Sequence, residues 1–413
     1  MRRFRIALLG VLACLLLPLA GPAQPQAQDD LRQGLAALSR NDLVHARECL
    51  ERASQADPRN GVVWIALAQT YLKSGQKDMA ARAAGRAEQF GASTPPVQHA
   101  LALYYAGTGE FAKAAEWERR FAASPGAGAQ AASSAAVLSL DAGQADEAVK
   151  WAQAALRGSD SPEMHHLLGQ AYQAAGRPDS ALPELRRAFE LAPAQEVFLS
   201  DYGQALLKAG EFAGAFAVLE NGQREFPKDP QIVLAYGVAC YVQRRMADAV
   251  SAFLQVIRLD DTVEQPYVFL GRTLEQAGAR LPEVIAAYAA WEKKAPDNYL
   301  PVFLHAKAIA ASNPEAPEIE PDLRRSIERN GAFWESHLEL GVLLSRQGKW
   351  PEAARELSRS IELNPDEPRT HYELARVYLR LGKPDLARAE RAESDRARNS
   401  ENTPEPQEGP GNK

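Results

Sequence analysis

The stretch from Leu168 to Pro193, LGQAYQAAGRPDSALPELRRAFELAP, is one copy of a pattern that recurs along the chain of 413 residues. Its clearest marker is a glycine, or a residue in its place, that returns every 33 to 35 positions. The marker positions are Asn41, Gly75, Gly109, Gly143, Gly176, Gly210, Arg244, Gly278, Asn313, Gly348 and Gly382. A period of this length indicates one helical hairpin that is copied many times.

The marker residue lies at the turn of each predicted hairpin. Apolar residues have helical spacing in a block before the turn, which includes Leu168, and in a block after it, which includes Ala181. Glycine suits the turn because helices commonly end at a residue in the left-handed conformation, and asparagine is the next best residue. Asn41 and Asn313 fit this role, whereas Arg244 predicts a strained or differently shaped turn.

Two further positions of the pattern hold small residues. The eighth position of a copy is glycine at Gly169 and Gly341, and the twentieth is alanine at Ala181 and Ala353. Small side chains at both positions predict that the two helices of a hairpin cross closely, while larger residues fill the space around the crossing.

From about residue 27 to residue 395 the chain resembles the tetratricopeptide repeat family. The second copy carries the family pattern almost completely, at Trp64, Leu67, Tyr71, Gly75, Ala80 and Ala87. The resemblance implies an all-α fold, an α-solenoid in which about eleven helix-turn-helix hairpins stack as a right-handed superhelix. It also implies that the second, fifth, ninth, twelfth and thirteenth residues of a copy face a concave groove; these are called groove positions below.

Two copies depart from the pattern. The eighth has one extra residue around Arg280, and the ninth has three prolines between Ser312 and Asp322, where its second helix should start. Those prolines predict either a lengthened turn or a hinge. Residues 388–395 give the last helix a polar outer face, which ends the stack, and residues 396–413 are expected to form a disordered polar tail.

The N-terminus has the features of an export signal. Three arginines among the first five residues precede an apolar run from Ile6 to Ala20, and small residues up to Ala23 offer a cleavage site. We therefore expect residues 1–23 to be a signal peptide, residues 24–26 a short linker, and the protein to be periplasmic or secreted. Retention of the apolar run as a membrane anchor is an alternative. Lipidation at Cys14 is disfavoured because the apolar run continues beyond it.

Composition restricts the class of partner. The formal net charge of −6 argues against a general affinity for nucleic acid.

After removal of the signal, Cys49 and Cys240 remain. They are six copies apart, which is too far for a disulfide in a stack of hairpins.

No catalytic or cofactor-binding motif occurs in the sequence, so we expect a protein that is not an enzyme and has no cofactor. His165, His337 and His371 share the fourth position of their copies, and this regularity indicates packing residues rather than metal ligands. An enzyme with an unrecognised site remains an alternative.

One candidate peptide-binding groove comes from apolar residues at groove positions in three consecutive copies. They are Leu234, Val238, Tyr241, Val268 and Phe303, with the cations Arg272 and Lys307 beside them. A contiguous apolar patch with a polar rim is typical of a protein or peptide site. The alternative is that neighbouring hairpins cover these side chains.

A second candidate is a basic stripe in the last copy. Arg369, Tyr372, Arg376 and Arg380 lie three or four residues apart and so share one face of a helix. The stripe could bind an acidic peptide, an anionic glycan or lipid headgroups, or it could be a solvated terminal face.

These observations together predict a non-catalytic, exported scaffold or adaptor that binds a peptide or a partner protein in its groove. The expected partners include no nucleic acid, and they include a membrane only if the N-terminal segment is retained. In that case the protein would be an assembly factor or subunit of an envelope complex.

Overall fold

The computed structural model describes residues 25–401, and within them the chain is helical, with 22 α-helices, two short 3₁₀ helices and no strand. The predicted all-α solenoid class is confirmed. The chain divides into two compact units, Met1–Glu211 and Phe212–Lys413.

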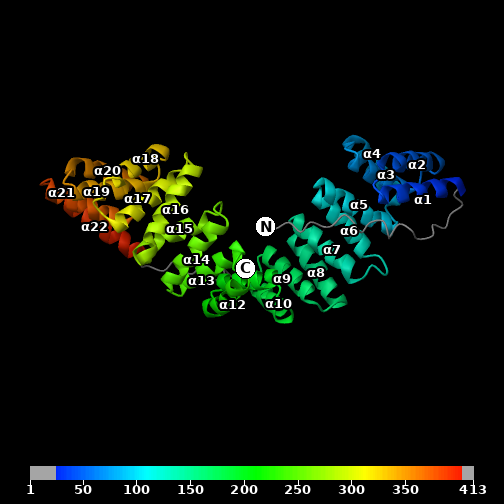
Figure 1. Cartoon of the computed structure of the whole chain (residues 1–413), viewed down its shortest axis with the longest axis horizontal. Coiled ribbons are helices and arrows are strands. Elements are labelled where there is room, and N and C mark those ends of the chain that lie inside the picture. Colours follow the sequence, from blue (N-terminus) through cyan, green and yellow to red (C-terminus); the bar gives the residue numbers. More distant parts are fainter. Residues whose placement is uncertain (1–24, 402–413) are drawn as a thin grey trace, which may run out of the picture. The chain divides into compact units, whose positions relative to one another are not determined.

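In the first unit each helix packs against the next in chain order, and consecutive hairpins lie side by side (Figure 1). Its helices are α1 (Pro25–Ser39), α2 (Leu43–Ala56), α3 (Gly61–Lys73), α4 (Lys77–Gly91), α5 (Pro95–Thr108), α6 (Phe111–Ala122), α7 (Gly128–Asp141), α8 (Ala145–Gly158), α9 (Pro162–Ala174), α10 (Pro178–Leu191) and α11 (Glu196–Lys208).

The second unit has the same hairpin packing, with one irregular region in its middle. Its helices are α12 (Phe212–Glu225), α13 (Pro230–Val242), α14 (Met246–Leu259), α15 (Gln265–Arg272), η3 (Leu274–Gln276), η4 (Gly278–Arg280), α16 (Leu281–Lys294), α17 (Tyr299–Ser312), α18 (Ile319–Arg329), α19 (Trp334–Arg346), α20 (Trp350–Leu363), α21 (Pro368–Arg380) and α22 (Pro384–Glu401).

The hairpin turns have the left-handed residue that the sequence predicts. Gly176 has φ of 69°, Asn41 has φ of 59°, and Arg244 has φ of 61° despite its side chain. The Arg244 turn therefore has the same form as the glycine turns, so of the two predicted alternatives it is the strained turn rather than the differently shaped one. The expected strain holds, because left-handed φ costs a non-glycine residue about 1–2 kcal/mol.

Asn313 does not take the left-handed conformation, so its assignment as a turn residue of this kind is wrong. Its φ is −144°, in the extended region. The cause is Pro314, because a residue before proline is pushed toward extended backbone.

The predicted close crossing of paired helices is confirmed. Nine copies have alanine at the twentieth position, and all nine are at most 4% exposed: Ala46, Ala80, Ala114, Ala148, Ala181, Ala215, Ala249, Ala353 and Ala387. A Cβ added at Gly169 would lie 2.7 Å from Cγ of Leu185, and one added at Gly341 would lie 2.6 Å from Cγ of Leu357. Larger residues at the eighth position would therefore displace the facing leucine.

The irregular region covers the eighth and ninth copies. The first helix of the eighth copy, α15, ends at Arg272 and continues as the 3₁₀ helices η3 and η4. In the ninth copy, α17 ends at Ser312 and α18 begins only at Ile319, so the prolines lengthen the turn.

The array extends slightly beyond its expected limits. Helix α1 begins at Pro25, and α22 continues to Glu401, into the segment from Arg396 that the sequence predicts to be a tail. Buried contacts explain the continuation, because Ala397 is 8% exposed and Oγ of Ser394 donates a hydrogen bond to the Pro368 carbonyl oxygen. The predicted signal at residues 1–23 and the rest of the predicted tail lie outside the described residues. Among residues 25–401, no helix has the length and apolar character needed to cross a membrane.

Candidate functional site

The apolar groove set lies on α13, α15 and α17. Leu234, Val238, Tyr241 and Val268 are partly exposed. Phe303 is only 4% exposed, because the ring of Phe333 packs edge-on against it at 4.9 Å. The expectation that Phe303 contributes to an exposed patch is therefore wrong, and the accessible apolar residues come from α13 and α15.

The two cations of this set each lie near an aromatic ring. The guanidinium of Arg272 is 5.9 Å from the ring centroid of Phe269, and the ammonium of Lys307 is 5.6 Å from that of Phe303. The face of an aromatic ring attracts a cation electrostatically, and this attraction lowers the cost of placing the cation next to an apolar surface.

Two of the three cations of the basic stripe on α21 are paired with carboxylates. Arg369 donates to Glu339 at 2.7 Å, and Arg376 donates to Glu373 at 2.9 Å. Arg380 instead lies over the ring of Trp350, at 5.8 Å. Tyr372 is 41% exposed. The stripe is thus less positive than its sequence indicates.

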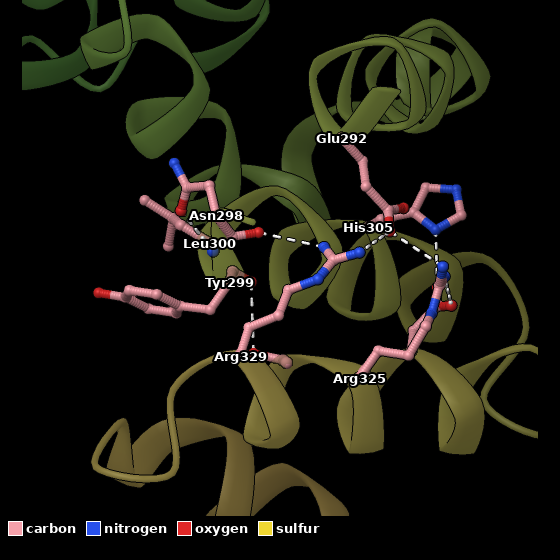
Figure 2. Close-up of polar contacts among 9 residues, drawn as sticks. Glu292, Asn298, Tyr299, Leu300, His305, Arg325 and Arg329 are labelled. Carbon is pink, nitrogen blue, oxygen red and sulfur yellow. Dashed lines mark hydrogen bonds and ion pairs between the residues drawn. The ribbon is translucent and has the colours of Figure 1, made fainter. Parts of the chain in front are cut away.

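A polar network joins α16 of the eighth copy to α17 and α18 of the ninth (Figure 2). At its centre is Asp322, which is 4% exposed and accepts hydrogen bonds from His305 at 2.7 Å and from Arg325 at 2.6 Å. Burial disfavours the Asp322 carboxylate, but these two hydrogen bonds outweigh burial and lower the pKa of Asp322.

Glu292 of α16 connects this network to the preceding hairpin. It forms ion pairs with Arg325 at 3.0 Å and with Arg329 at 2.9 Å, and Arg329 also donates to the Asn298 carbonyl oxygen (Figure 2). Helix α18 starts late and is short, so it has fewer residues that can pack against its neighbours. The ion pairs of Arg325 and Arg329 with Glu292 therefore help to hold it in place.

A small pocket lies at the same irregular copy, between α17, α18 and α19. It has a volume of about 40 Å³. Most of its lining residues are apolar, and three are charged. The lining consists of Ala306, Ala310, Pro314, Ile319, Leu323, Val342 and Leu343, with the charged Lys307, Glu339 and Arg346.

The sequence did not reveal that the fourth position of a copy supplies a hydrogen-bond donor. Trp64 donates from Nε1 to the Pro58 carbonyl oxygen at 2.8 Å, and Gln98 donates from Nε2 to the Ala92 carbonyl oxygen at 2.7 Å. His371 makes the equivalent contact to Pro365, also six residues earlier, at 2.8 Å. Each bond satisfies a carbonyl near the end of the preceding hairpin.

The histidines at this position also join the two helices of their own hairpin. The Nδ1 atoms of His165, His337 and His371 each contact a glutamate 19 residues later, at 2.6 to 2.7 Å. The recurrence of His with a Glu 19 residues later is the signal that could have predicted these pairs. Among residues 25–401, no three His, Cys, Asp or Glu side chains are grouped as metal ligands.

Comparison with known proteins fits this architecture. One sequence profile of the tetratricopeptide repeat matches residues 323–401, and a second matches residues 37–104 and 172–236. Together they cover about half of the chain. It belongs to the tetratricopeptide repeat family. Folds of this family commonly bind protein partners and are typically non-catalytic scaffolds.

Several solved tetratricopeptide repeat structures are similar at low sequence identity. A chain of the APC/C hetero-tetramer Cut9-Hcn1 is 14% identical, with a TM-score of 0.41 over 97% of this chain and 96% of that one. Yeast Tom70 is 12% identical, with a TM-score of 0.39 over 90% and 92% of the two chains. The C-terminal part of a repeat protein from Cytophaga hutchinsonii is 16% identical, with a TM-score of 0.42 over 66% and 98%. No curated protein sequence matches the chain.

Proposed function

We propose that this tetratricopeptide repeat protein is a non-catalytic scaffold or adaptor that binds a peptide or protein partner on the groove positions of its second unit. The observation that carries the proposal is the row of partly exposed apolar side chains on α13 and α15, at Leu234, Val238, Tyr241 and Val268. Apolar groups flanked by a cation such as Arg272 suit a protein interface, where aromatic and arginine side chains contribute most to affinity.

The test is affinity capture from the envelope fraction with the double variant Tyr241→Ala/Val268→Ala. We expect recovery of the partner to fall about tenfold, which corresponds to a loss of about 1.4 kcal/mol. The melting temperature should stay within about 3 °C of the wild type, because both side chains are partly exposed. Mass spectrometry of the captured proteins measures the recovery.

The matched control is Val44→Ala/Leu386→Ala, which removes apolar groups that are 64% and 47% exposed elsewhere on the chain. Recovery with this control should equal that of the wild type. Equal recovery with the Tyr241→Ala/Val268→Ala variant would contradict a binding site on α13 and α15.

We further propose that the protein is exported and that residues 1–23 are removed. The support is the run of three arginines followed by the apolar segment from Ile6 to Ala20. The intact mass of the protein recovered from cells is expected to match a chain that starts at Gln24. A mass that includes residues 1–23 would support the membrane-anchored alternative instead.

A further inference from the structure

We propose that the pocket between α17, α18 and α19 binds one small apolar side chain of an extended acidic peptide. This inference rests on the proposed function and specifies the chemistry of the partner. It is carried by the shape of the pocket and by the cations at its edge.

The pocket exists because the ninth copy is irregular. Because of Pro314 and the residues after it, α18 begins only at Ile319. Fewer residues of the second helix therefore pack over the end of α17 than in a regular copy. On the side of α17, the lining residues Ala306 and Ala310 are too small to fill the space. A volume of about 40 Å³ holds roughly three water-sized groups, which fits a side chain of the size of valine.

Two of the residues that line the pocket are cations. Among the described residues, neither Lys307 nor Arg346 forms an ion pair within 4.0 Å. The third charged residue of the lining, Glu339, is already paired with Arg369 at 2.7 Å. Unpaired cations beside an apolar hollow favour a ligand that brings negative charge next to an apolar group.

A further carboxylate nearby reduces this positive charge. Glu335 is on the same helix as Glu339, and burial raises the pKa of Glu335, while the charge of Lys307 opposes that shift. Arg369 also interacts electrostatically with Glu367 and Glu373, so the positive charge at the pocket comes from Lys307 and Arg346.

The cations continue beyond the pocket, one for each hairpin. Arg272, Lys307, Arg346 and Arg380 occupy groove positions on α15, α17, α19 and α21, and none of them forms an ion pair among the described residues. Packed helices lie about 8–10 Å apart, and an extended peptide advances about 3.3 Å per residue. Helix α15 contacts α17 and helix α19 contacts α21, so an acidic residue at about every third position would match the cations within each of these two pairs.

The experiment uses fluorescence anisotropy with a labelled peptide of four Asp-Val-Thr repeats and the full-length protein. We expect saturable binding at low salt that weakens as salt screens the charges. Peptides with lysine in place of aspartate, or glycine in place of valine, should bind at least about tenfold more weakly, since each removes one of the two recognised features.

Two variants locate the site. Lys307→Gln/Arg346→Gln is expected to weaken binding of the Asp-Val-Thr peptide about tenfold, and Ala310→Phe is expected to fill the pocket and remove binding. The charge-matched control is Lys293→Gln/Arg355→Gln, which removes two exposed cations from second helices, and it should bind as the wild type does. Because Ala310→Phe could perturb packing, the glutamine pair, which changes only polar ends, decides the outcome.

Wild-type protein that does not bind the Asp-Val-Thr peptide would overturn this inference, as would equal binding by the Lys307→Gln/Arg346→Gln variant. Tighter binding of a single-stranded oligonucleotide of similar length would overturn it too. These failures are distinct from failure of the proposed function. Suppose that binding of the captured partner is weakened by Tyr241→Ala/Val268→Ala but not by Lys307→Gln/Arg346→Gln. This result would support the proposed scaffold function and contradict only the inference of an acidic peptide ligand.

Discussion

Replacement of Phe253 by alanine is expected to lower the free energy of unfolding of the second unit by about 3–5 kcal/mol. Phe253 is fully buried, and its ring stacks on that of Phe269 with centroids 5.0 Å apart. It also faces Gly237, where an added Cβ would come within 2.8 Å of its ring. The backbone at that close crossing cannot collapse easily, so alanine would leave a cavity lined by apolar groups.

Urea unfolding followed by circular dichroism measures the total loss, and amide hydrogen exchange locates it. Since repeats contact mainly their neighbours, α13 to α15 should lose more protection than α19 to α22. Leu259→Ala is the control in the same helix, because Leu259 is 39% exposed. This substitution should lower the free energy of unfolding by less than about 1 kcal/mol. A similar small loss for Phe253→Ala would show that this crossing is not tightly packed.

The second large effect is expected from Asp322→Asn, which should destabilise the second unit by about 2–3 kcal/mol at pH 7. The change replaces a carboxylate that accepts hydrogen bonds from His305 and Arg325 in a buried position. The estimate lies below the full cost of breaking a buried ion pair, because the side chain of Arg325 is 45% exposed and water can solvate its charge.

The pH dependence of this effect has a definite sign. The pKa of Asp322 is lowered in the folded protein, so its stabilisation is present above the unfolded-state pKa of about 3.9 and is lost as the pH falls through the lower folded-state pKa. The wild type and Asp322→Asn should therefore differ in melting temperature near pH 7, and the difference should begin to shrink only below about pH 4.

Glu328→Gln is the control for this variant, since Glu328 is an exposed acid on the same helix. It should change the free energy of unfolding by less than about 0.5 kcal/mol at either pH. A difference between wild type and Asp322→Asn that stays constant from pH 7 to pH 3 would contradict the assigned role of the carboxylate.

The sequence alone predicted the succession of helices, their turns and their small crossing residues. These features follow local rules: helical spacing of apolar residues, left-handed φ at a helix end, and limited space where two helices cross. The turn prediction that failed was local too, because Pro314 overrode the preference of Asn313. At Arg244 the predicted strained turn holds, with φ of 61°.

The candidate sites were predicted less completely, because exposure and ion pairing depend on residues far apart in the sequence. Phe303 and Tyr241 both occupy groove positions, yet only Phe303 is covered, by Phe333, the residue just before the first helix of the following hairpin. Likewise the charge of Arg369 is offset by Glu339, which lies 30 residues earlier.

The sequence by itself determined that this protein is a stack of tetratricopeptide hairpins, since a period of about 34 residues encodes one unit whose internal contacts are mostly close in sequence. Only the tertiary structure decided which groove residues remain accessible, which cations lack a carboxylate, and that the prolines of the ninth copy leave a pocket between α17 and α19. The physical reason is that burial and pairing are set between hairpins, by contacts that the repeat pattern of a single copy does not contain.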